Sequence, residues 1–327
     1  MSKNISSNNS LRLALVALAI GLASCNQNTN TAFTQTTTRN NNLPQVVTTT
    51  NVLCDFTRQV AGNSVNLTCL IPPGADPHVY QPKQEDREAM QTASLILYNG
   101  YNLEPSLIRL IKATKNRTPK IAVGQVAVPK PQQFQQNSKI NDPHVWHNVK
   151  NAIAMVDVIS RNLEKVSPEN ATLYSSNARQ IKSELTQLDS WVKSRITTIP
   201  ANQRQLVTIH DAMGYYASSY GLSLKGTLSG ITTEKKPTDA RVKSLVNNIK
   251  QARVPTIFPE TTINPNLIQS VARQARVKVS QRELFTDGLG EPGSEGETYQ
   301  KMMTANTRTI VEGLGGTYLI FVPKTRN

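Results

Sequence analysis

The sequence predicts an α/β protein of two lobes, each a parallel sheet flanked by helices, joined by one long rigid connecting helix. Three observations lead to this prediction. Short runs rich in β-branched residues alternate with helical patterns in both halves of the chain, which is typical of parallel sheets. A length of 327 residues exceeds one small domain, so two lobes are expected, each with its own core. An unusually long helical pattern separates the two halves.

The composition is that of a protein that folds in water. Hydrophobic residues make up 38% of the chain and charged residues 18%, which is neither a disordered nor a membrane-spanning balance. The formal net charge of +14 is strongly basic, but the basic residues are scattered, without dense runs or interleaved aromatic residues. We therefore expect a solvated basic surface that attracts anionic lipid headgroups, and no nucleic-acid partner.

The N-terminus predicts export. Lys3 and Arg12 precede an uncharged apolar run over 13–22 that is too short for a permanent transmembrane helix. The run ends in Leu-Ala-Ser-Cys, which resembles the lipobox of bacterial lipoproteins, so we predict a signal peptide over 1–24 and lipidation of Cys25. An ordinary signal peptide followed by an incidental cysteine is the alternative.

Residues 25–42 predict a disordered polar tether. From position 26 they are almost entirely Asn, Thr and Gln, with no apolar periodicity that could form a core. The folded part is expected to start at residue 43. The mature protein is therefore expected in the periplasm or on the cell surface, attached to membrane lipid through Cys25.

Both lobes show the same alternation of strands and helices. The first lobe is predicted over 43–166 and the second over 200–327. The strands expected in the first lobe are 45–50, 65–71, 95–98 and 120–123. Those expected in the second lobe are 205–209, 222–227, 256–258 and 277–279. After Thr238 a helix is expected whose apolar face is formed by Val242, Leu245, Val246, Ile249 and Ala252.

The connecting helix is predicted over 167–199. Ser167 supplies a cap, and Pro168 and Glu169 fill the first turn. Pro200 ends the helix. Apolar residues recur at spacings of three and four and form one stripe of Ile181, Leu185, Leu188, Val192 and Ile196. A continuous helix between the lobes predicts slight rocking rather than closure through a large flexible hinge.

Two cysteines remain once Cys25 is lipidated. Cys54 and Cys69 form an even pair in a compartment that permits disulfides. Cys54 ends the first strand region and Cys69 ends the second, and adjacent parallel strands would bring those ends together. We therefore predict a disulfide between them, with two buried free thiols as the alternative.

Three of the four histidines lie in loops just past or near predicted strands, where the functional residues of open α/β sheets concentrate. His78 ends the segment Pro-Pro-Gly-Ala-Asp-Pro-His, His144 lies in Asp-Pro-His-Val-Trp, and His210 lies in Ile-His-Asp-Ala. Pro77 and Pro143 fix the backbone before the first two histidines, so these loops can present the imidazoles rigidly. A single loop histidine is more often a surface residue than a ligand, but the combination favours a binding site.

These segments resemble those of the zinc- and manganese-binding solute-receptor lipoproteins of bacterial ABC importers. The resemblance runs from about Val46 to Leu314, and its most specific elements are the three histidine segments. The third segment continues as His-Asp-Ala-Met-Gly-Tyr-Tyr over 210–216. Gly-Ile-Thr-Thr-Glu at 230–234 and Phe-Thr-Asp at 285–287 follow in the order that the family shows.

The resemblance implies a four-ligand metal site in the cleft between the lobes. His78 and His144 would come from the first lobe, and His210 and Asp287 from the second. The implied function is capture of a divalent metal outside the cytoplasm and its delivery to an ABC transporter permease, and we expect a monomer. Because the metal completes its shell only when both lobes contribute ligands, binding would favour the closed arrangement.

Zn²⁺ is the metal that we predict, with Mn²⁺ as the alternative. Three imidazoles and one carboxylate suit Zn²⁺ better than Mn²⁺, which prefers oxygen-rich sites. In this family, receptors with Glu at the position of His210 look more like manganese receptors, yet some with three His and one Asp bind manganese too. Zinc receptors often insert a His- and acid-rich loop, whereas residues 125–141 here are Gln-rich and contain no histidine.

Further residues lie close to these ligands in sequence. His147 is three positions past His144, where a helix is expected to begin, and we predict a solvent or capping role for it rather than metal binding. Asp76, Asp142 and Asp211 each lie within two residues of a ligand histidine. They are candidate hydrogen-bond partners of the imidazoles, as are backbone carbonyls.

An enzyme is not expected. A catalytic zinc site keeps a position open for water beside a general base, commonly in a His-Glu-x-x-His helix, and the sequence has no such motif. Four protein ligands would leave little room for an activated water. An adhesin-type surface lipoprotein is the other alternative, because export and tethering suit it equally well.

Overall fold

The computed structural model describes residues 42–134, 137–230, 232–234 and 236–324. The described residues belong to one compact unit. The predicted signal peptide, Cys25 and the tether up to residue 41 lie outside the described residues. No helix in the described part of the chain is long and apolar enough to cross a membrane.

The first lobe is built on a four-stranded parallel sheet with the order β2-β1-β3-β4. Its strands are β1 Gln45–Thr48, β2 Asn66–Cys69, β3 Leu95–Tyr98 and β4 Lys120–Ala122, which confirms all four predicted strands. Its helices are α1 Asn51–Ala61, α2 Gln84–Thr92, α3 Pro105–Ala113 and α4 Val123–Ala127. Because the strands are parallel, the loops that follow them leave from one edge of the sheet.

A short antiparallel pair follows, formed by β5 Gln133–Phe134 and β6 Asn137–Asn141. The chain then makes a single 3₁₀ turn, η1 (Val145–His147), before the helix α5 (Val149–Val166). The Asn148 side chain caps α5 by accepting a hydrogen bond from the Lys150 N–H at 2.9 Å.

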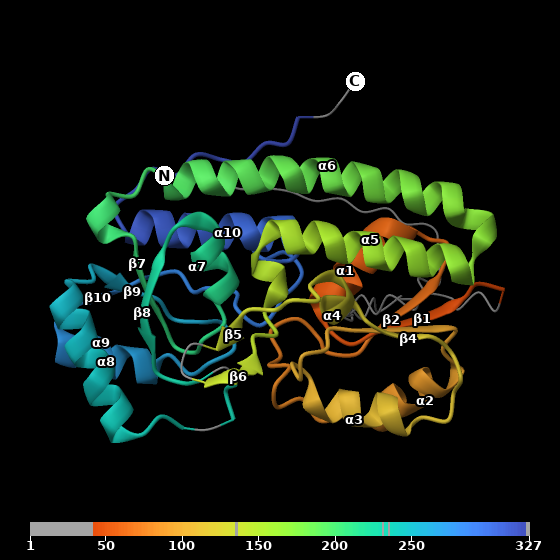
Figure 1. Ribbon diagram of the computed structural model, residues 1–327, viewed down its shortest axis with the longest axis horizontal. Helices are drawn as coiled ribbons and strands as arrows, with labels where there is room; N and C mark the ends of the chain where they lie inside the picture. Colours follow the sequence, from red (N-terminus) through yellow and green to blue (C-terminus); the bar gives the residue numbers. More distant parts are fainter. Residues whose placement is uncertain (1–41, 135–136, 231, 235, 325–327) are drawn as a thin grey trace, which may run out of the picture. The chain divides into compact units, whose positions relative to one another are not determined.

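The predicted connecting helix is α6, Ala171–Ile196, and all five residues of its predicted stripe are buried. The helical stretch begins at Pro168 as predicted, but its first turn is 3₁₀. Ser167 hydrogen-bonds Glu169 within the 3₁₀ turn η2 (Pro168–Asn170), and the α-helix begins only after that turn. Figure 1 shows α6 running along α5, and it also packs against α1 and against α10 (Tyr299–Gly313). The helix therefore contacts elements of both lobes.

The second lobe contains two parallel strand pairs, β7–β8 and β9–β10. The strands are β7 Gln205–Thr208, β8 Ser223–Thr227, β9 Thr256–Ile257 and β10 Lys278–Val279. The pairs lie side by side, because the Phe258 N–H donates to the Val207 carbonyl at 3.1 Å. The other helices are η3 Ala201–Gln203, α7 Gly214–Tyr220, α8 Asp239–Ala252 and α9 Asn266–Ala275, and α8 confirms the helix predicted after Thr238.

The expectation that each lobe has its own core is only partly right. Two smaller hydrophobic clusters are each confined to one lobe, one around Ile96 and the other around Ile249. The largest cluster is shared, and it includes Phe56 of α1, Leu185 of α6 and Met303 of α10. The reason is that α6 presents one long apolar stripe to helices of both lobes. A large shared core resists hinge motion between the lobes. The predicted boundaries of the lobes stay predictions.

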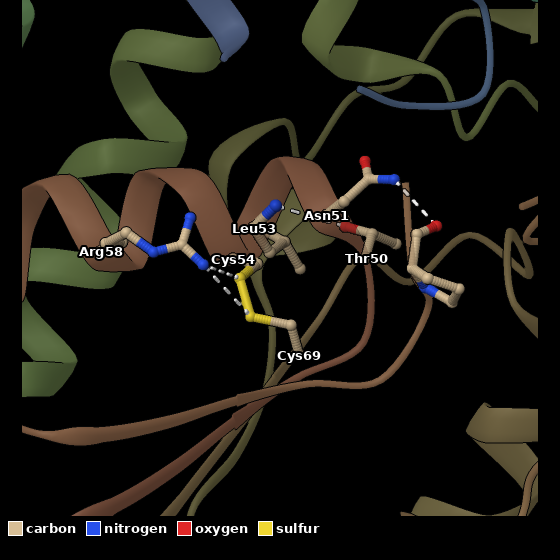
Figure 2. Close-up of a disulfide and its surroundings, with 7 residues drawn as sticks. Thr50, Asn51, Leu53, Cys54, Arg58 and Cys69 are labelled. Atoms are coloured by element: carbon tan, nitrogen blue, oxygen red, sulfur yellow. Dashed lines mark hydrogen bonds between the residues drawn. A yellow bond between two sulfur atoms is a disulfide. The ribbon is translucent and has the colours of Figure 1, made fainter. Parts of the chain in front are cut away.

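Figure 2 shows the disulfide between Cys54 and Cys69, whose Cα atoms are 5.6 Å apart. The predicted place of Cys54 at a strand end is wrong, because Cys54 lies on α1. The Thr50 hydroxyl accepts the Leu53 N–H and starts the helix directly after β1. Cys54 therefore reaches Cys69, the last residue of β2, from the helix, and Arg58 Nη2 lies 3.2 Å from the Cys54 sulfur.

Candidate metal centre

Four buried side chains with metal-ligating atoms come together from both lobes, and one such atom of each lies within 4.8 Å of those of the other three. They are the four predicted ligands, His78, His144, His210 and Asp287. His78 lies in the loop between β2 and α2, His144 directly before η1, and His210 two residues after β7. Asp287 follows Leu284, which forms an isolated parallel bridge with Glu260.

Three imidazole Nε2 atoms surround one carboxylate oxygen. Asp287 Oδ1 lies 3.2 Å from Nε2 of His210, 3.4 Å from that of His78 and 3.6 Å from that of His144. The Nε2 atoms of His78 and His144 are 3.2 Å apart. The three rings meet edge to face, with centroids 5.3 to 5.8 Å apart. Four donors facing one point is the arrangement of a four-coordinate metal site.

In the first lobe, an aspartate two residues before each histidine holds it. Asp76 Oδ1 accepts the His78 backbone N–H at 2.8 Å, and Asp142 Oδ1 accepts that of His144 at 2.9 Å. Asp142 Oδ1 also lies 2.8 Å from His144 Nδ1, and because a carboxylate only accepts, this Nδ1 carries a hydrogen. The other oxygen of Asp76 accepts the Thr233 hydroxyl of the second lobe.

In the second lobe, a distant glutamate holds His210. Glu260 Oε1 accepts the backbone N–H groups of Ile209 at 2.5 Å and of His210 at 2.9 Å. Its other oxygen, Oε2, accepts the His210 Nδ1–H and also the Thr286 hydroxyl, the latter at 3.0 Å. Glu260 is fully buried, so all of these bonds form away from water. The imidazole of His210 is thereby fixed with Nε2 toward Asp287.

Asp287 is oriented by one further hydroxyl. The Thr262 Oγ1 donates to Asp287 Oδ2 at 2.7 Å, which leaves Oδ1 facing the three imidazoles. Among the described residues, neither Asp287 Oδ1 nor His210 Nε2 has a hydrogen-bond partner, although both are buried. Buried polar atoms without a partner are costly, and a cation placed between them would satisfy both.

The pKa values show how strongly the four groups interact. Burial alone would raise the pKa of Asp287, but the charge of His210 and the close approach of the three imidazoles hold it well below its usual range. Burial would lower the pKa of His210, but Asp287 and Glu260 hold it well above the usual value. The pKa of His144 is raised too, because its hydrogen bond to Asp142 and the nearby carboxylate of Asp287 outweigh burial. The site favours positive charge, whether a proton or a metal supplies it.

The donor set fits a divalent transition metal. The Nδ1 atoms of His144 and His210 are bound to carboxylates, so each ring can present an unprotonated Nε2 to a metal. Imidazole nitrogen and carboxylate oxygen are both donors that such metals bind. With four protein donors facing one point, the arrangement is suited to holding an ion rather than to activating water.

Several residues that hold the ligands were not among those predicted from the sequence. Glu260, Thr262 and Thr286 were not singled out, although Glu260 comes just after the predicted strand 256–258, which neighbours the strand before His210. Of the three candidate aspartates, Asp142 is confirmed as a hydrogen-bond partner of the His144 imidazole. Asp211 is not the partner of His210, because Glu260 takes that place.

The predicted solvent or capping role of His147 is wrong. Its side chain is fully buried, and its Nε2 lies 2.8 Å from the carbonyl oxygen of Thr286. The helix α5 begins two residues later and is capped by Asn148, so the 3₁₀ turn points the imidazole inward. His147 lies outside the cluster of four candidate ligands.

Known proteins with this fold bind transition metals. The chain is 31% identical over 277 residues to the manganese ABC transporter substrate-binding lipoprotein PsaA of Streptococcus mitis, covering 83% of this chain and 89% of that protein. It is 32% identical over 275 residues to the manganese-binding lipoprotein MntA of Bacillus subtilis, covering 83% and 89%. The structure of the periplasmic zinc-binding protein TroA of Treponema pallidum matches with a TM-score of 0.79 and 31% identity, over 83% of this chain and 99% of that one.

A family match covers both lobes and all four candidate ligands. Residues 46–313 match the family described as zinc-uptake complex component A, periplasmic. The two-lobe α/β fold with its long joining helix agrees with that of the solved relative. The chain therefore belongs to this family of metal-binding solute receptors of ABC metal importers.

Proposed function

We propose that this receptor binds one divalent transition metal ion, with zinc preferred, and delivers it to the permease of an ABC transporter. The proposed ligands are His78, His144, His210 and Asp287. The observation that carries the proposal is the convergence of three Nε2 atoms on Asp287 Oδ1 in a buried site. Family membership supports the receptor role.

Zinc is the proposed cargo because of the donor set. Imidazole nitrogen suits borderline Zn²⁺, whereas Mn²⁺ prefers sites rich in oxygen. The carboxylates on Nδ1 of His144 and His210 make these rings stronger nitrogen donors, which increases the preference. Manganese is the second candidate, because PsaA and MntA are described as manganese proteins.

The proposal also covers where the receptor works. Both relatives named above are lipoproteins, and the lipobox-like sequence before Cys25 gives this chain the same anchor. The receptor would act as a monomer outside the cytoplasm, held to membrane lipid by the tether. Because each lobe supplies two ligands, the bound ion joins the lobes and favours the closed receptor that the permease would recognise.

Metal analysis of the protein purified without added metal tests this proposal. We expect one ion per chain, and we expect Zn²⁺ to displace Mn²⁺ in a competition titration. Asp287→Asn should abolish high-affinity binding because it weakens the donor that faces all three imidazoles. Asp157→Asn is the matched control, since Asp157 is a partly exposed partner of Lys182.

His144→Ala separates a receptor from an adhesin. Removal of one of four ligands should abolish metal binding while the fold persists, and the surface far from the site should be unchanged. If the His144→Ala protein retains the metal content and affinity of the wild type, the four-ligand proposal is wrong and a surface-binding role is favoured.

His210→Glu tests the choice of metal. The change gives two nitrogen and two carboxylate donors, so the affinity for Zn²⁺ should fall relative to that for Mn²⁺. The readout is the ratio of the two dissociation constants, which general weakening of the site would leave constant. An unchanged ratio would show that His210 is not a ligand. Affinity should also weaken as pH falls, because protons compete with the metal for the imidazoles.

A further inference from the structure

A fully buried histidine outside the ligand cluster connects the two lobes beside the site. His147 belongs to the first lobe, and its Nε2 lies 2.8 Å from the carbonyl oxygen of Thr286, which belongs to the second. A carbonyl oxygen only accepts, so His147 Nε2 carries the hydrogen and donates it. The residue after Thr286 is the proposed ligand Asp287.

Burial keeps this donor in one state. The desolvation of the imidazole lowers the pKa of His147 to about 4, so the ring is neutral at physiological pH. A neutral imidazole has one N–H group, and here that group is committed to the Thr286 carbonyl. Within the described residues, Nδ1 of His147 has no hydrogen-bond partner. This hydrogen bond therefore attaches the ring of His147 to the second lobe.

Thr286 is connected to both proposed ligands of the second lobe. Its backbone leads directly to Asp287, and its hydroxyl donates to Glu260 Oε2 at 3.0 Å. Glu260 in turn holds the backbone and the Nδ1 of His210. One residue thus connects His147 to the supports of Asp287 and His210.

On the side of the first lobe, a backbone hydrogen bond joins His147 to the proposed ligand His144. His144 directly precedes the 3₁₀ turn η1 and His147 ends it, and the His147 N–H donates to the His144 carbonyl at 3.3 Å. Trp146, between them, is also fixed, because the Tyr299 hydroxyl donates to its carbonyl at 2.7 Å. The backbone of this turn therefore fixes His147 relative to His144.

We propose that His147 is a positioning residue that sets the placement of Asp287 and His210 relative to His144, and thereby the affinity and geometry of the metal site. This inference rests on the proposed function, because it concerns the same four ligands. Its physical basis is the buried hydrogen bond from His147 to the Thr286 carbonyl. Without its donor this buried carbonyl would be unsatisfied, which is costly, so the backbone at Thr286 would shift to find another donor. A histidine that merely filled space would not need its N–H.

Two substitutions separate the donor from the volume. His147→Leu fills a similar space without a donor, and His147→Gln keeps an N–H close to the position of Nε2. Each protein is titrated with Co²⁺, whose visible absorption reports the geometry of the site, and the Zn²⁺ dissociation constant is measured by competition with a chelator. Thermal unfolding of the metal-free proteins records the stability separately.

We expect His147→Leu to bind Zn²⁺ at least about tenfold more weakly and to change the Co²⁺ spectrum, as removal of outer partners of a metal site does. His147→Gln should restore the spectrum and most of the affinity. A folded His147→Leu protein with wild-type affinity and spectrum would overturn the inference, as would a folded His147→Gln protein that fails as His147→Leu does. If His147→Leu does not fold, His147→Asn takes its place, because its amide falls short of the carbonyl, and the same outcomes apply.

The two proposals fail in different ways. If the wild type binds neither Zn²⁺ nor Mn²⁺ at one ion per chain, the proposed function is wrong. If the wild type binds and the His147→Leu protein is indistinguishable from it, only the role of His147 is wrong.

Discussion

The two lobes hold their ligands by different means. In the first lobe, each histidine is held by an aspartate two residues earlier, Asp76 for His78 and Asp142 for His144. In the second lobe, His210 is held by Glu260, which is 50 residues away in sequence. Asp287 is held by Thr262, which is 25 residues away. The first pair is supported by local turns and the second by tertiary packing.

Each lobe also buries a glutamate near the ends of its strands, and the two differ in the same way. Glu260 binds a proposed ligand directly. Glu104 accepts the Thr49 hydroxyl at 2.8 Å and the Asn99 N–H at 2.7 Å. It reaches the site only through Asn99, whose side chain donates to the Pro143 carbonyl at 2.9 Å. In the first lobe the acid bonded to a ligand imidazole is the sequence neighbour Asp142, whereas in the second lobe it is the distant Glu260.

The largest expected effect concerns Glu104 and the pH dependence of stability. Burial raises the pKa of Glu104 to about 7 from an ordinary value of 4.5. Below pH 4.5 the carboxyl is protonated in both the folded and unfolded states, and between pH 4.5 and 7 only the unfolded state ionises. Folding stability is therefore lost as pH rises through this window, by about 3 kcal/mol from this group.

Glu104→Gln isolates this contribution. The variant cannot ionise at this position, so its free energy of unfolding should fall by about 3 kcal/mol less than that of the wild type between pH 4.5 and 7.5. Urea denaturation at several pH values measures the difference. Zn²⁺ affinity should change little, because Glu104 is two contacts away from His144. Parallel pH profiles for the two proteins would contradict the prediction.

The disulfide is a second feature of the first lobe alone, since the chain has no cysteine after Cys69. The Cys54→Ser/Cys69→Ser protein should lose about 3 kcal/mol of unfolding free energy, because the bridge closes a loop with a sequence separation of 15. Hydrogen exchange should show the loss first at β2 and α1. Metal affinity should be retained.

Thiol titration provides the direct check on this bridge. Unfolded, unreduced Cys25→Ala protein should show no free thiol, and two free thiols would refute the disulfide. Reduced wild type serves as the matched control, because it should have the stability of the double serine variant. Equal loss of exchange protection in both lobes would show that the bridge stabilises the shared core rather than the first lobe.

Glu260→Gln should weaken Zn²⁺ binding by about 100-fold. Both oxygens of Glu260 accept from donors: Oε1 accepts two backbone N–H groups, and Oε2 accepts the His210 Nδ1–H and the Thr286 hydroxyl. Whichever way the amide is turned, its NH₂ group faces donors. The least costly response is for His210 to accept at Nδ1, which places its hydrogen on Nε2, where the metal should bind. The Zn²⁺ dissociation constant measures the effect, and a change below about threefold would refute it.

The difference between the lobes explains what sequence reasoning could find. Two of the ligands lie in short segments with a proline directly before the histidine, Pro77 before His78 and Pro143 before His144. The complete set of four was implied by the resemblance to the receptor family. The strands were also found, because each is a short β-branched run of the kind that parallel sheets bury. The disulfide partners were identified although Cys54 was placed on a strand end, because α1 follows β1 so closely that both positions lie near Cys69.

What could not be found depends on residues far apart in sequence. Nothing near His147 indicates that its imidazole meets Thr286, which is 139 residues away. Glu260 carried one usable signal, an acid directly after a short strand, but its pairing with His210 requires knowing that β9 lies beside β7. The shared core follows from how α6 contacts helices of both lobes, which the apolar stripe alone does not specify.

The smallest effect is expected for Asp142→Asn, the local counterpart of Glu260→Gln. Asp142 uses a single oxygen, Oδ1, for both the His144 backbone N–H and its Nδ1. An asparagine can keep its carbonyl oxygen there and turn its NH₂ group to the place of Oδ2, and Pro143 still fixes the backbone. The hydrogen stays on Nδ1, so Nε2 of His144 remains a donor to the metal. We expect Zn²⁺ affinity to fall about tenfold, because the neutral acceptor makes His144 a weaker ligand. Measured side by side, a greater loss for Asp142→Asn than for Glu260→Gln would reverse the comparison and assign the stricter support to the first lobe.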